Sequence, residues 1–221
     1  MLKIKDKEKE IERVKHILDI LARIYPDASC GLNFHNPFEL LIATILSAQT
    51  TDQKVNQATA ELFRQYPTPQ AMAALTPEEL EKHIKMLGLF RTKAKNIVAT
   101  CRILLEQYNG LVPPEMEKLV QLPGVGRKTA GVVLANAFGI PAFPVDTHVL
   151  RVTNRLGLTD SSNPLQVEKD LTFLIEKNRW IDYHHRFIAH GRKICQAKKP
   201  QCQECPLSNY CLFHNMGGKL H

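Results

Sequence analysis

Lys128 and Asp146 are the residues whose types and spacing first suggest chemistry in this chain. Lys128 lies in the first turn of a helix expected over residues 127–138, where the helix dipole disfavours a charged amine and so favours a nucleophile. Asp146 is the next acidic residue and follows a proline-rich connection that could return it toward Lys128. Taken singly, the lysine reads as a surface residue and the aspartate as the N-cap of a helix over 147–156. As a pair flanking one short helix, they predict a nucleophile with an acidic partner.

A cluster of cysteines near the C-terminus could surround a metal centre. The spacing is C-x6-C-x2-C-x5-C, and its members are Cys195, Cys202, Cys205 and Cys211. Four thiolates this close can hold an iron–sulfur cluster. A four-cysteine zinc site usually has two short knuckles, whereas only one short pair is present here. Spacing alone leaves zinc and iron–sulfur about equally open. The two isolated cysteines, Cys30 and Cys101, are expected to be ordinary buried thiols.

A glycine turn precedes the lysine helix and must position it. Gly124 and Gly126 permit positive φ and close backbone approach, so residues 123–126 predict a tight turn. The turn leads into a helix N-terminus, whose unpaired N–H groups and positive dipole end form a ready anion site. DNA phosphate is the obvious anion for a basic protein. Alone, however, the pattern would indicate only two helices joined by a turn.

These segments resemble a known family. LPGVGRKTA followed by VDTHV resembles the helix–hairpin–helix and Gly/Pro-Asp signature of the endonuclease III family of DNA glycosylases. The resemblance extends from about residue 37 to residue 211. It implies that Lys128 is the catalytic lysine, that Asp146 is the catalytic aspartate, and that the four clustered cysteines hold a structural [4Fe–4S] cluster.

The resemblance also implies which residues contact DNA. Gln49 matches a glutamine that enters the gap left by a flipped nucleotide, and Leu89 matches a wedge residue. Without the resemblance, Gln49 could equally cap a helix and Leu89 could equally belong to the core. The remaining expected contacts are the hairpin residues Gly124, Gly126 and Arg127, the residue His148, and the loop lysines Lys198 and Lys199. The two lysines belong to a basic run without acidic residues, which predicts contacts to DNA phosphates. The alternative interpretation of this run is a solvated surface.

The rest of the chain predicts an all-α fold. Apolar residues recur at helical spacing from Ile11 to Ile24, and the run FELLIATILSA is apolar on nearly all sides, as for a buried central helix. Helix starts are expected after caps at Asn36, Thr50, Thr68, Thr76 and Asn163. The family organisation implies two helical domains with a DNA cleft between them. Residues 30–140 would form a six-helix barrel-like domain with the hairpin, and residues 1–29 and 141–221 a discontinuous cluster domain.

Composition narrows the class of protein. The 221 residues carry a formal net charge of +7, and the pI is near 9.1, which favours an anionic partner. No apolar run is long enough for a membrane span, and the charged N-terminus lacks a signal-peptide pattern. We therefore expect an intracellular monomer in the cytoplasm or nucleoid, with no membrane partner. Six cysteines in such a protein argue against a disulfide framework.

The predicted activity is excision of oxidised or saturated pyrimidines from double-stranded DNA, followed by cleavage of the abasic site. A monofunctional glycosylase is the alternative enzyme, but Lys128 and the short chain argue against it. A non-catalytic DNA-binding module with a metal staple would explain the hairpin, charge and cysteines. It would give Lys128 and Asp146 no joint role.

Overall fold

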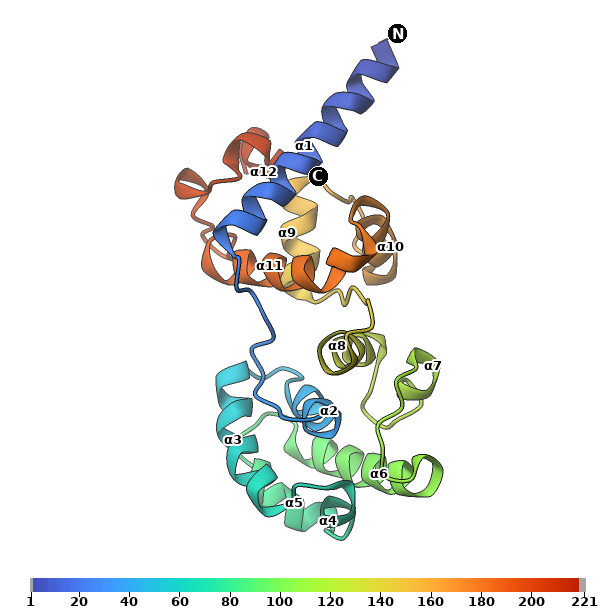
Figure 1. Cartoon of the computed structure of the whole chain (residues 1–221). Coiled ribbons are helices and arrows are strands. Elements are labelled where there is room, and N and C mark those ends of the chain that lie inside the picture. Colours follow the sequence, from blue (N-terminus) through green and yellow to red (C-terminus); the bar gives the residue numbers. More distant parts are fainter. Residues whose placement is uncertain (1, 219–221) are drawn as a thin grey trace. The chain divides into compact units, whose positions relative to one another are not determined.

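A computed structural model describes residues 2–218, and the side chains from residue 7 onward (Figure 1). The described residues contain helices and no strand, which confirms the all-α prediction. Two compact units divide the chain: residues 30–142 form one, and residues 1–29 with 143–221 form the other. Both boundaries fall within the breaks that the sequence offered, at residues 26–36 and 139–144.

The unit of residues 30–142 is built around α2 (Pro37–Leu46). Nine of its ten residues are buried, from Phe38 to Leu46, as the all-round apolar sequence predicted. It packs against α3 (Asp52–Gln65), α6 (Phe90–Tyr108) and α8 (Arg127–Phe138) (Figure 1). The unit is completed by α4 (Pro69–Ala73), α5 (Pro77–Ile84) and α7 (Met116–Leu119), and α4 and α5 pack against α6.

The other unit joins the N-terminal helix to the last third of the chain. Its helices are α1 (Leu2–Ile24), α9 (Thr147–Leu156), α10 (Pro164–Leu174), α11 (Trp180–Lys193) and α12 (Leu212–Asn215). Helix α11 packs against both α1 and α9. Ile17 and Leu21 from α1 meet Tyr183 and Phe187 from α11 in a fully buried core. Helices α9 and α11 approach closely at Gly191, where an added Cβ would lie 3.1 Å from His148.

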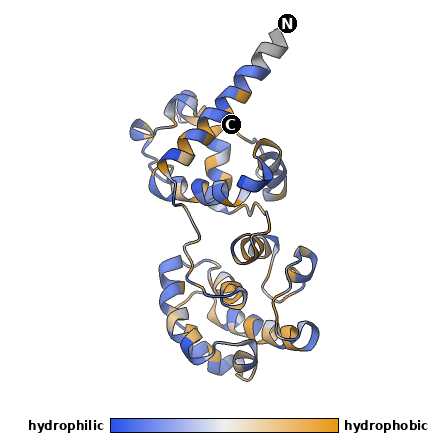
Figure 2. Ribbon diagram, viewed as in Figure 1, coloured by the Kyte–Doolittle hydropathy of each residue, from blue (hydrophilic) through white to orange (hydrophobic). Residues whose placement is uncertain are grey.

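Each unit has its own apolar interior, with mainly hydrophilic residues on its outer faces (Figure 2). Three short 3₁₀ helices, η1 (Lys177–Arg179), η2 (Cys202–Glu204) and η3 (Ser208–Tyr210), lie in the connections of the second unit. No helix among residues 2–218 is long and apolar enough to cross a membrane.

Most predicted helix starts are confirmed. Asn36, Thr68 and Thr76 cap their helices, and Thr76 with Glu79 forms a complete capping box. The prediction at Thr50 is wrong, because Thr51 is the N-cap of α3 and no side chain caps it. The Thr50 hydroxyl instead accepts a hydrogen bond from Lys93 Nζ at 3.0 Å. Cys101 is buried as expected, but Cys30 is only half-buried because it lies in the connection between the units.

Candidate functional site

The glycine hairpin is held by α6. Gly124 has φ of +78°, and a Cβ there would lie 2.8 Å from the Asn96 amide nitrogen. This position therefore requires glycine for both its backbone angle and its close contact. On the same helix, the Thr100 hydroxyl donates to the Pro123 carbonyl at 3.0 Å. The turn itself is closed by the Val125 N–H, which donates to the Leu122 carbonyl at 3.0 Å.

Gly126 has a different role from the one expected. Its φ is −89°, so of the two turn glycines only Gly124 uses the positive φ that both permit. Gly126 is the N-cap of α8, where a side chain normally caps the helix, yet none does so. A Cβ at Gly126 would meet nothing within 4 Å. The first N–H groups of α8 therefore lie behind open space, which is the arrangement an anion needs.

Lys128 is exposed in the first turn of α8, one residue after the exposed Arg127. The helix forms where expected, from Arg127 to Phe138, and its buried side carries Val132, Val133 and Ala135. The fold therefore fixes the backbone of Lys128 next to the open glycine cap and leaves its side chain accessible.

Two loops of the same unit present Gln49 and Leu89. Both are exposed, and Leu89 is 56% exposed, so the alternative of a core leucine is wrong. Both residues have left-handed backbones, with φ of 54° at Gln49 and 57° at Leu89. Such angles are uncommon for residues other than glycine. The loops are neighbours, since a Cβ on Gly88 would lie 3.9 Å from the Gln49 carbonyl oxygen.

Asp146 lies in the other unit and caps α9. Its Oδ1 accepts the Val149 N–H at 2.8 Å, as predicted for an N-cap, and the residue is half-buried. The preceding connection is anchored by His184, whose Nδ1 is 2.8 Å from the Pro144 carbonyl oxygen. His184 and its neighbour His185 are both buried. Lys128 and Asp146 thus belong to different units, each fixed by its own helix start.

His148 follows in the first turn of α9 and is half-buried. Burial is the main cause that lowers its pKa, and the charges of Arg151 and Arg192 lower it further, against the opposing effect of Asp146. Arg151 Nη2 lies 3.1 Å from His148 Nδ1, and because a guanidinium can only donate, this contact favours the tautomer in which Nδ1 accepts. In that tautomer Nε2 carries the hydrogen and can donate.

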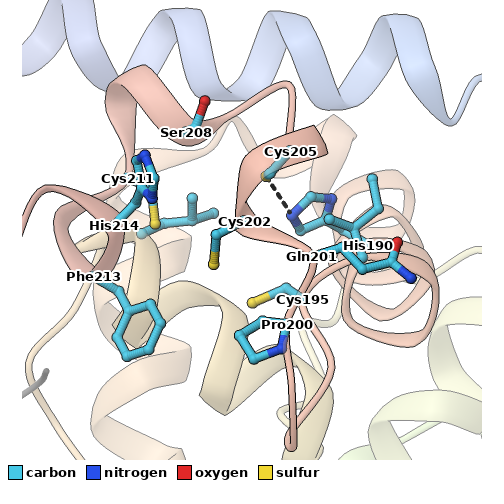
Figure 3. A pocket seen from close by; sticks show the side chains of 12 residues that line it. His190, Cys195, Pro200, Gln201, Cys202, Cys205, Ser208, Cys211, Phe213 and His214 are labelled. Carbon is cyan, nitrogen blue, oxygen red and sulfur yellow. Dashed lines mark hydrogen bonds between the residues drawn. The ribbon is translucent and has the colours of Figure 1, made fainter. Parts of the chain in front are cut away.

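The four clustered cysteines line one cavity, together with residues such as His190 and Phe213 (Figure 3). Cys195 follows α11, Cys202 begins the η2 turn and Cys205 follows it, and Cys211 precedes α12. All four thiols line this common space, which suits a multi-iron cluster with one thiolate on each iron.

Local contacts of the thiols fit a bound, negatively charged group. Arg155 Nη1 lies 3.5 Å from Cys195 Sγ, and His190 Nε2 lies 3.6 Å from Cys205 Sγ. Burial raises the pKa of the Cys205 thiol to about 11 and also raises that of Cys211. As free thiols these side chains keep their protons, and the Cys211 thiol donates to the Arg155 carbonyl. Iron would replace those protons, because metal ligation requires the thiolate.

Two arginines on α9 fasten the start of the cysteine loop, and the sequence reasoning missed both. Arg151 donates to the Cys195 carbonyl at 3.0 Å and to the Gly191 carbonyl at 2.9 Å. Arg155 donates to the Gln196 carbonyl at 2.7 Å and to the Ala197 carbonyl at 3.1 Å. The only sequence signal was their spacing of four residues, which places both on one face of the helix.

Lys198 and Lys199 are exposed in the loop between Cys195 and Cys202. Lys199 has φ of 55°, so the loop turns sharply at this residue. The loop is closed by the Gln201 N–H, which donates to the Ile194 carbonyl at 3.1 Å. The two ammonium groups are therefore presented by a short loop whose ends are tied to α11 and α9.

These features define a class of protein when the chain is compared with known families. Residues 42–177, which include the hairpin, Lys128 and Asp146, match the HhH-GPD superfamily of base excision DNA repair proteins. Residues 195–211, from the first to the last clustered cysteine, match the iron–sulfur binding domain of endonuclease III.

Individual relatives place the chain within that class. It is 49% identical to endonuclease III of Synechocystis sp. over 90% of this chain and 92% of the relative. It is also 49% identical to endonuclease III of Escherichia coli over 89% of this chain and 94% of the relative. A solved structure of a trapped endonuclease III–DNA covalent intermediate superposes with a TM-score of 0.91 at 48% identity, covering 95% of this chain and 99% of that one. The chain belongs to the endonuclease III family.

Membership of this family establishes the general function of the protein. The protein is a DNA glycosylase/AP lyase of base excision repair, it binds DNA, and its cofactor is a [4Fe–4S] cluster. The resemblance read from LPGVGRKTA, VDTHV and the cysteine spacing is thereby confirmed.

Proposed function

We propose that this protein excises oxidised or saturated pyrimidines from duplex DNA through a Schiff base on Lys128 and then cleaves the abasic strand. One observation carries the proposal: an exposed lysine stands in the first turn of α8, beside a glycine N-cap with open space before it. A phosphate bound at that helix start would bring the adjacent sugar to the lysine. We further propose that a monomer suffices, because one chain carries the lysine, the aspartate and the four cysteines.

The chemistry follows from an amine nucleophile. The neutral Lys128 nitrogen forms a bond to the sugar C1′ while the bond from C1′ to the base breaks, and the departing base takes up a proton. The nitrogen lone pair then forms the C=N bond as the C1′–O4′ bond breaks, O4′ takes up a proton, and the protonated Schiff base remains. Loss of a C2′ proton supplies the electron pair that expels the 3′ phosphate, which is β-elimination. Hydrolysis of the imine releases the lysine.

Asp146 would take part in this reaction through Oδ2, because its other carboxylate oxygen, Oδ1, caps α9. Oδ1 accepts the Val149 N–H and fixes the orientation of the carboxylate. Oδ2 can then stabilise positive charge developing on the sugar and relay a proton to or from the amine.

DNA contacts are proposed for three groups of residues. Gln49 and Leu89 stand exposed on neighbouring loops and would fill the gap left by the flipped nucleotide. The hairpin residues Gly124, Gly126 and Arg127, together with His148 Nε2–H, would contact the backbone near the lesion. Lys198 and Lys199 would pair with more distant phosphates.

The cysteines Cys195, Cys202, Cys205 and Cys211 would hold the [4Fe–4S] cluster, which supplies structural cross-linking and leaves no iron open to substrate. By joining both ends of the 196–201 loop, the cluster would keep Lys198 and Lys199 extended toward DNA. Arg155 and His190 would donate toward the sulfurs of Cys195 and Cys205, and so lower the cost of burying the negative cluster.

Borohydride trapping tests the central step. Wild-type protein, Lys128→Ala and the control Lys82→Ala would be incubated with a duplex containing one thymine glycol, and the imine reduced. Lys82 is another exposed helical lysine of the same unit, on α5. We expect a covalent adduct with the wild type and with Lys82→Ala, and none with Lys128→Ala, which should still bind the duplex.

Each other outcome is informative. Base release without an adduct by the wild type would indicate a monofunctional glycosylase. An adduct with Lys128→Ala would mean that another amine is the nucleophile. If the wild type neither releases the base nor forms an adduct, a duplex with an abasic site becomes the next substrate. An adduct there would change the lesion class and keep the lysine.

A further inference from the structure

Lys93 is a buried lysine that the proposed reaction leaves unused. It lies in the first turn of α6 and is only 4% exposed. Lysines are almost never this buried unless they are paired. Among the described residues, its side chain has no carboxylate partner, and desolvation lowers its pKa. Such a placement is unfavourable for the stability of the fold.

The contacts of Lys93 lead to the two exposed loops. Its ammonium donates to the Thr50 hydroxyl at 3.0 Å. That hydroxyl in turn donates to the Ala48 carbonyl at 3.2 Å, so the two bonds brace the backbone on both sides of Gln49. The Lys93 backbone N–H donates to the Leu89 carbonyl at 3.0 Å and closes the first turn of α6. One residue thus has a hydrogen bond to each loop.

Both loops need such a brace. Gln49 and Leu89 hold left-handed backbones that disfavour side chains, so each would relax toward other angles if released. Both side chains also point into solvent, where no core packing fixes them. The only other non-glycine residues with positive φ in the described chain are Asn109, which ends α6, and Lys199.

We propose that Lys93 is a positioning residue that locks the Gln49 and Leu89 loops into one rigid unit for entering the duplex. This inference rests on the proposed gap-filling role of those two residues. A lysine suits the task because its long stem crosses the buried space and its ammonium makes a charge-assisted hydrogen bond at the far end.

The proposal separates activity from stability. Burying a charge without an ion-pair partner costs free energy, so an apolar side chain of similar length at this position removes that cost. Lys93→Met keeps the stem and the backbone bond to Leu89, and removes only the ammonium bond to Thr50 that fixes the Gln49 loop to α6. We therefore expect its thermal midpoint to be unchanged or raised while its activity on duplex DNA falls. A residue that served packing alone would lower both.

The experiment compares two substrates under single-turnover conditions. A thymine glycol duplex requires gap filling, whereas a single-stranded abasic oligonucleotide has no partner base to support. For Lys93→Met we expect a roughly tenfold slower rate on the duplex, the size that loss of one charge-assisted hydrogen bond supports. The rate on the single strand should match the wild type. Thr50→Val should reproduce this selective loss, and the double variant should be no slower than either single one.

Thr59→Val is the matched control. Thr59 is a buried threonine of α3, whose hydroxyl donates to the Val55 carbonyl within its own helix. It should keep the wild-type ratio of the two rates. An unchanged ratio in Lys93→Met, whether or not its midpoint falls, would overturn the proposal. Wild-type protein without activity on either substrate would instead refute the proposed function on which it rests.

Discussion

At the scale of single residues, Asp146 has a structural task and a proposed chemical one, and the two can be separated. Its Oδ1 caps α9 by accepting the Val149 N–H at 2.8 Å. Asparagine caps helices about as well as aspartate but carries no charge, whereas alanine cannot cap. Substitutions to asparagine and alanine therefore remove the charge alone, or the charge and the cap together.

We expect Asp146→Asn to unfold at nearly the wild-type temperature and Asp146→Ala to lose about 1 kcal/mol of stability. Both should excise thymine glycol roughly 100-fold more slowly, because both lack the carboxylate. Thermal unfolding and single-turnover excision rates would be measured on the same preparations. If Asp146→Asn keeps the wild-type rate, the aspartate is only a cap.

Some single-residue features could be predicted from the sequence, and others could not. The positions of Lys128 in a first turn and of Asp146 at an N-cap could be predicted from local sequence, whereas their chemical roles came from the family resemblance and stay predictions. The left-handed backbones of Gln49 and Leu89 could not, because neither residue type favours positive φ. Likewise, the sequence suggested that Gly126 is a second flexible residue of the turn. In the structure it is the N-cap of α8, and the absence of a side chain leaves open space at the start of that helix.

At the scale of elements, α9 connects the proposed catalytic carboxylate to the cysteine loop. Asp146 begins the helix, and Arg151 and Arg155 donate from its side to the backbone of residues 195–197. Arg155 also stacks over the Phe213 ring at 4.7 Å beyond the last cysteine. The helix therefore braces both the first and the last segments that would hold the cluster.

Arg155→Lys is expected to weaken retention of the cluster. The planar guanidinium of Arg155 contacts two carbonyls and a sulfur at once, and a single ammonium group cannot replace all three contacts. Loss of such supporting contacts typically weakens metal binding by roughly tenfold or more. The measurement is the decay of visible iron–sulfur absorbance in air. Arg102→Lys, on the exposed side of α6, is the control and should bleach at the wild-type rate. Equal bleaching of all three proteins would show that Arg155 does not support the cluster.

Helix positions were largely predictable, whereas helix partners were not. Helices α8 and α9 begin and end where the glycines, prolines and Asp146 indicated. The packing of α1 with α11 joins residues more than 150 positions apart, and no local pattern encodes that pairing. Helix α12 was missed because it has only four residues, too few for an apolar period. The family resemblance supplied the pairing of the chain ends that periodicity could not.

At the scale of the whole molecule, the net charge of +7 favours any DNA, damaged or not. Such attraction is not specific, so particular lysines must be tested against equal losses of charge elsewhere. Lys198 and Lys199 are suitable because both are exposed on one short loop. Lys169 and Lys177 are exposed in the same unit, on α10 and on η1, and provide a matched pair.

Replacing Lys198 and Lys199 with glutamine lowers the net charge from +7 to +5, as does replacing Lys169 and Lys177. If the loop lysines contact phosphates, the first double variant should lose roughly 0.9 of slope per lysine in log affinity against log salt. The control variant should keep the wild-type slope. Both should retain the wild-type single-turnover rate at saturating protein, because neither pair touches the reacting sugar. Equal slopes in the two variants would mean that the protein senses DNA through its overall charge, and that the cysteine loop does not place its lysines on the backbone.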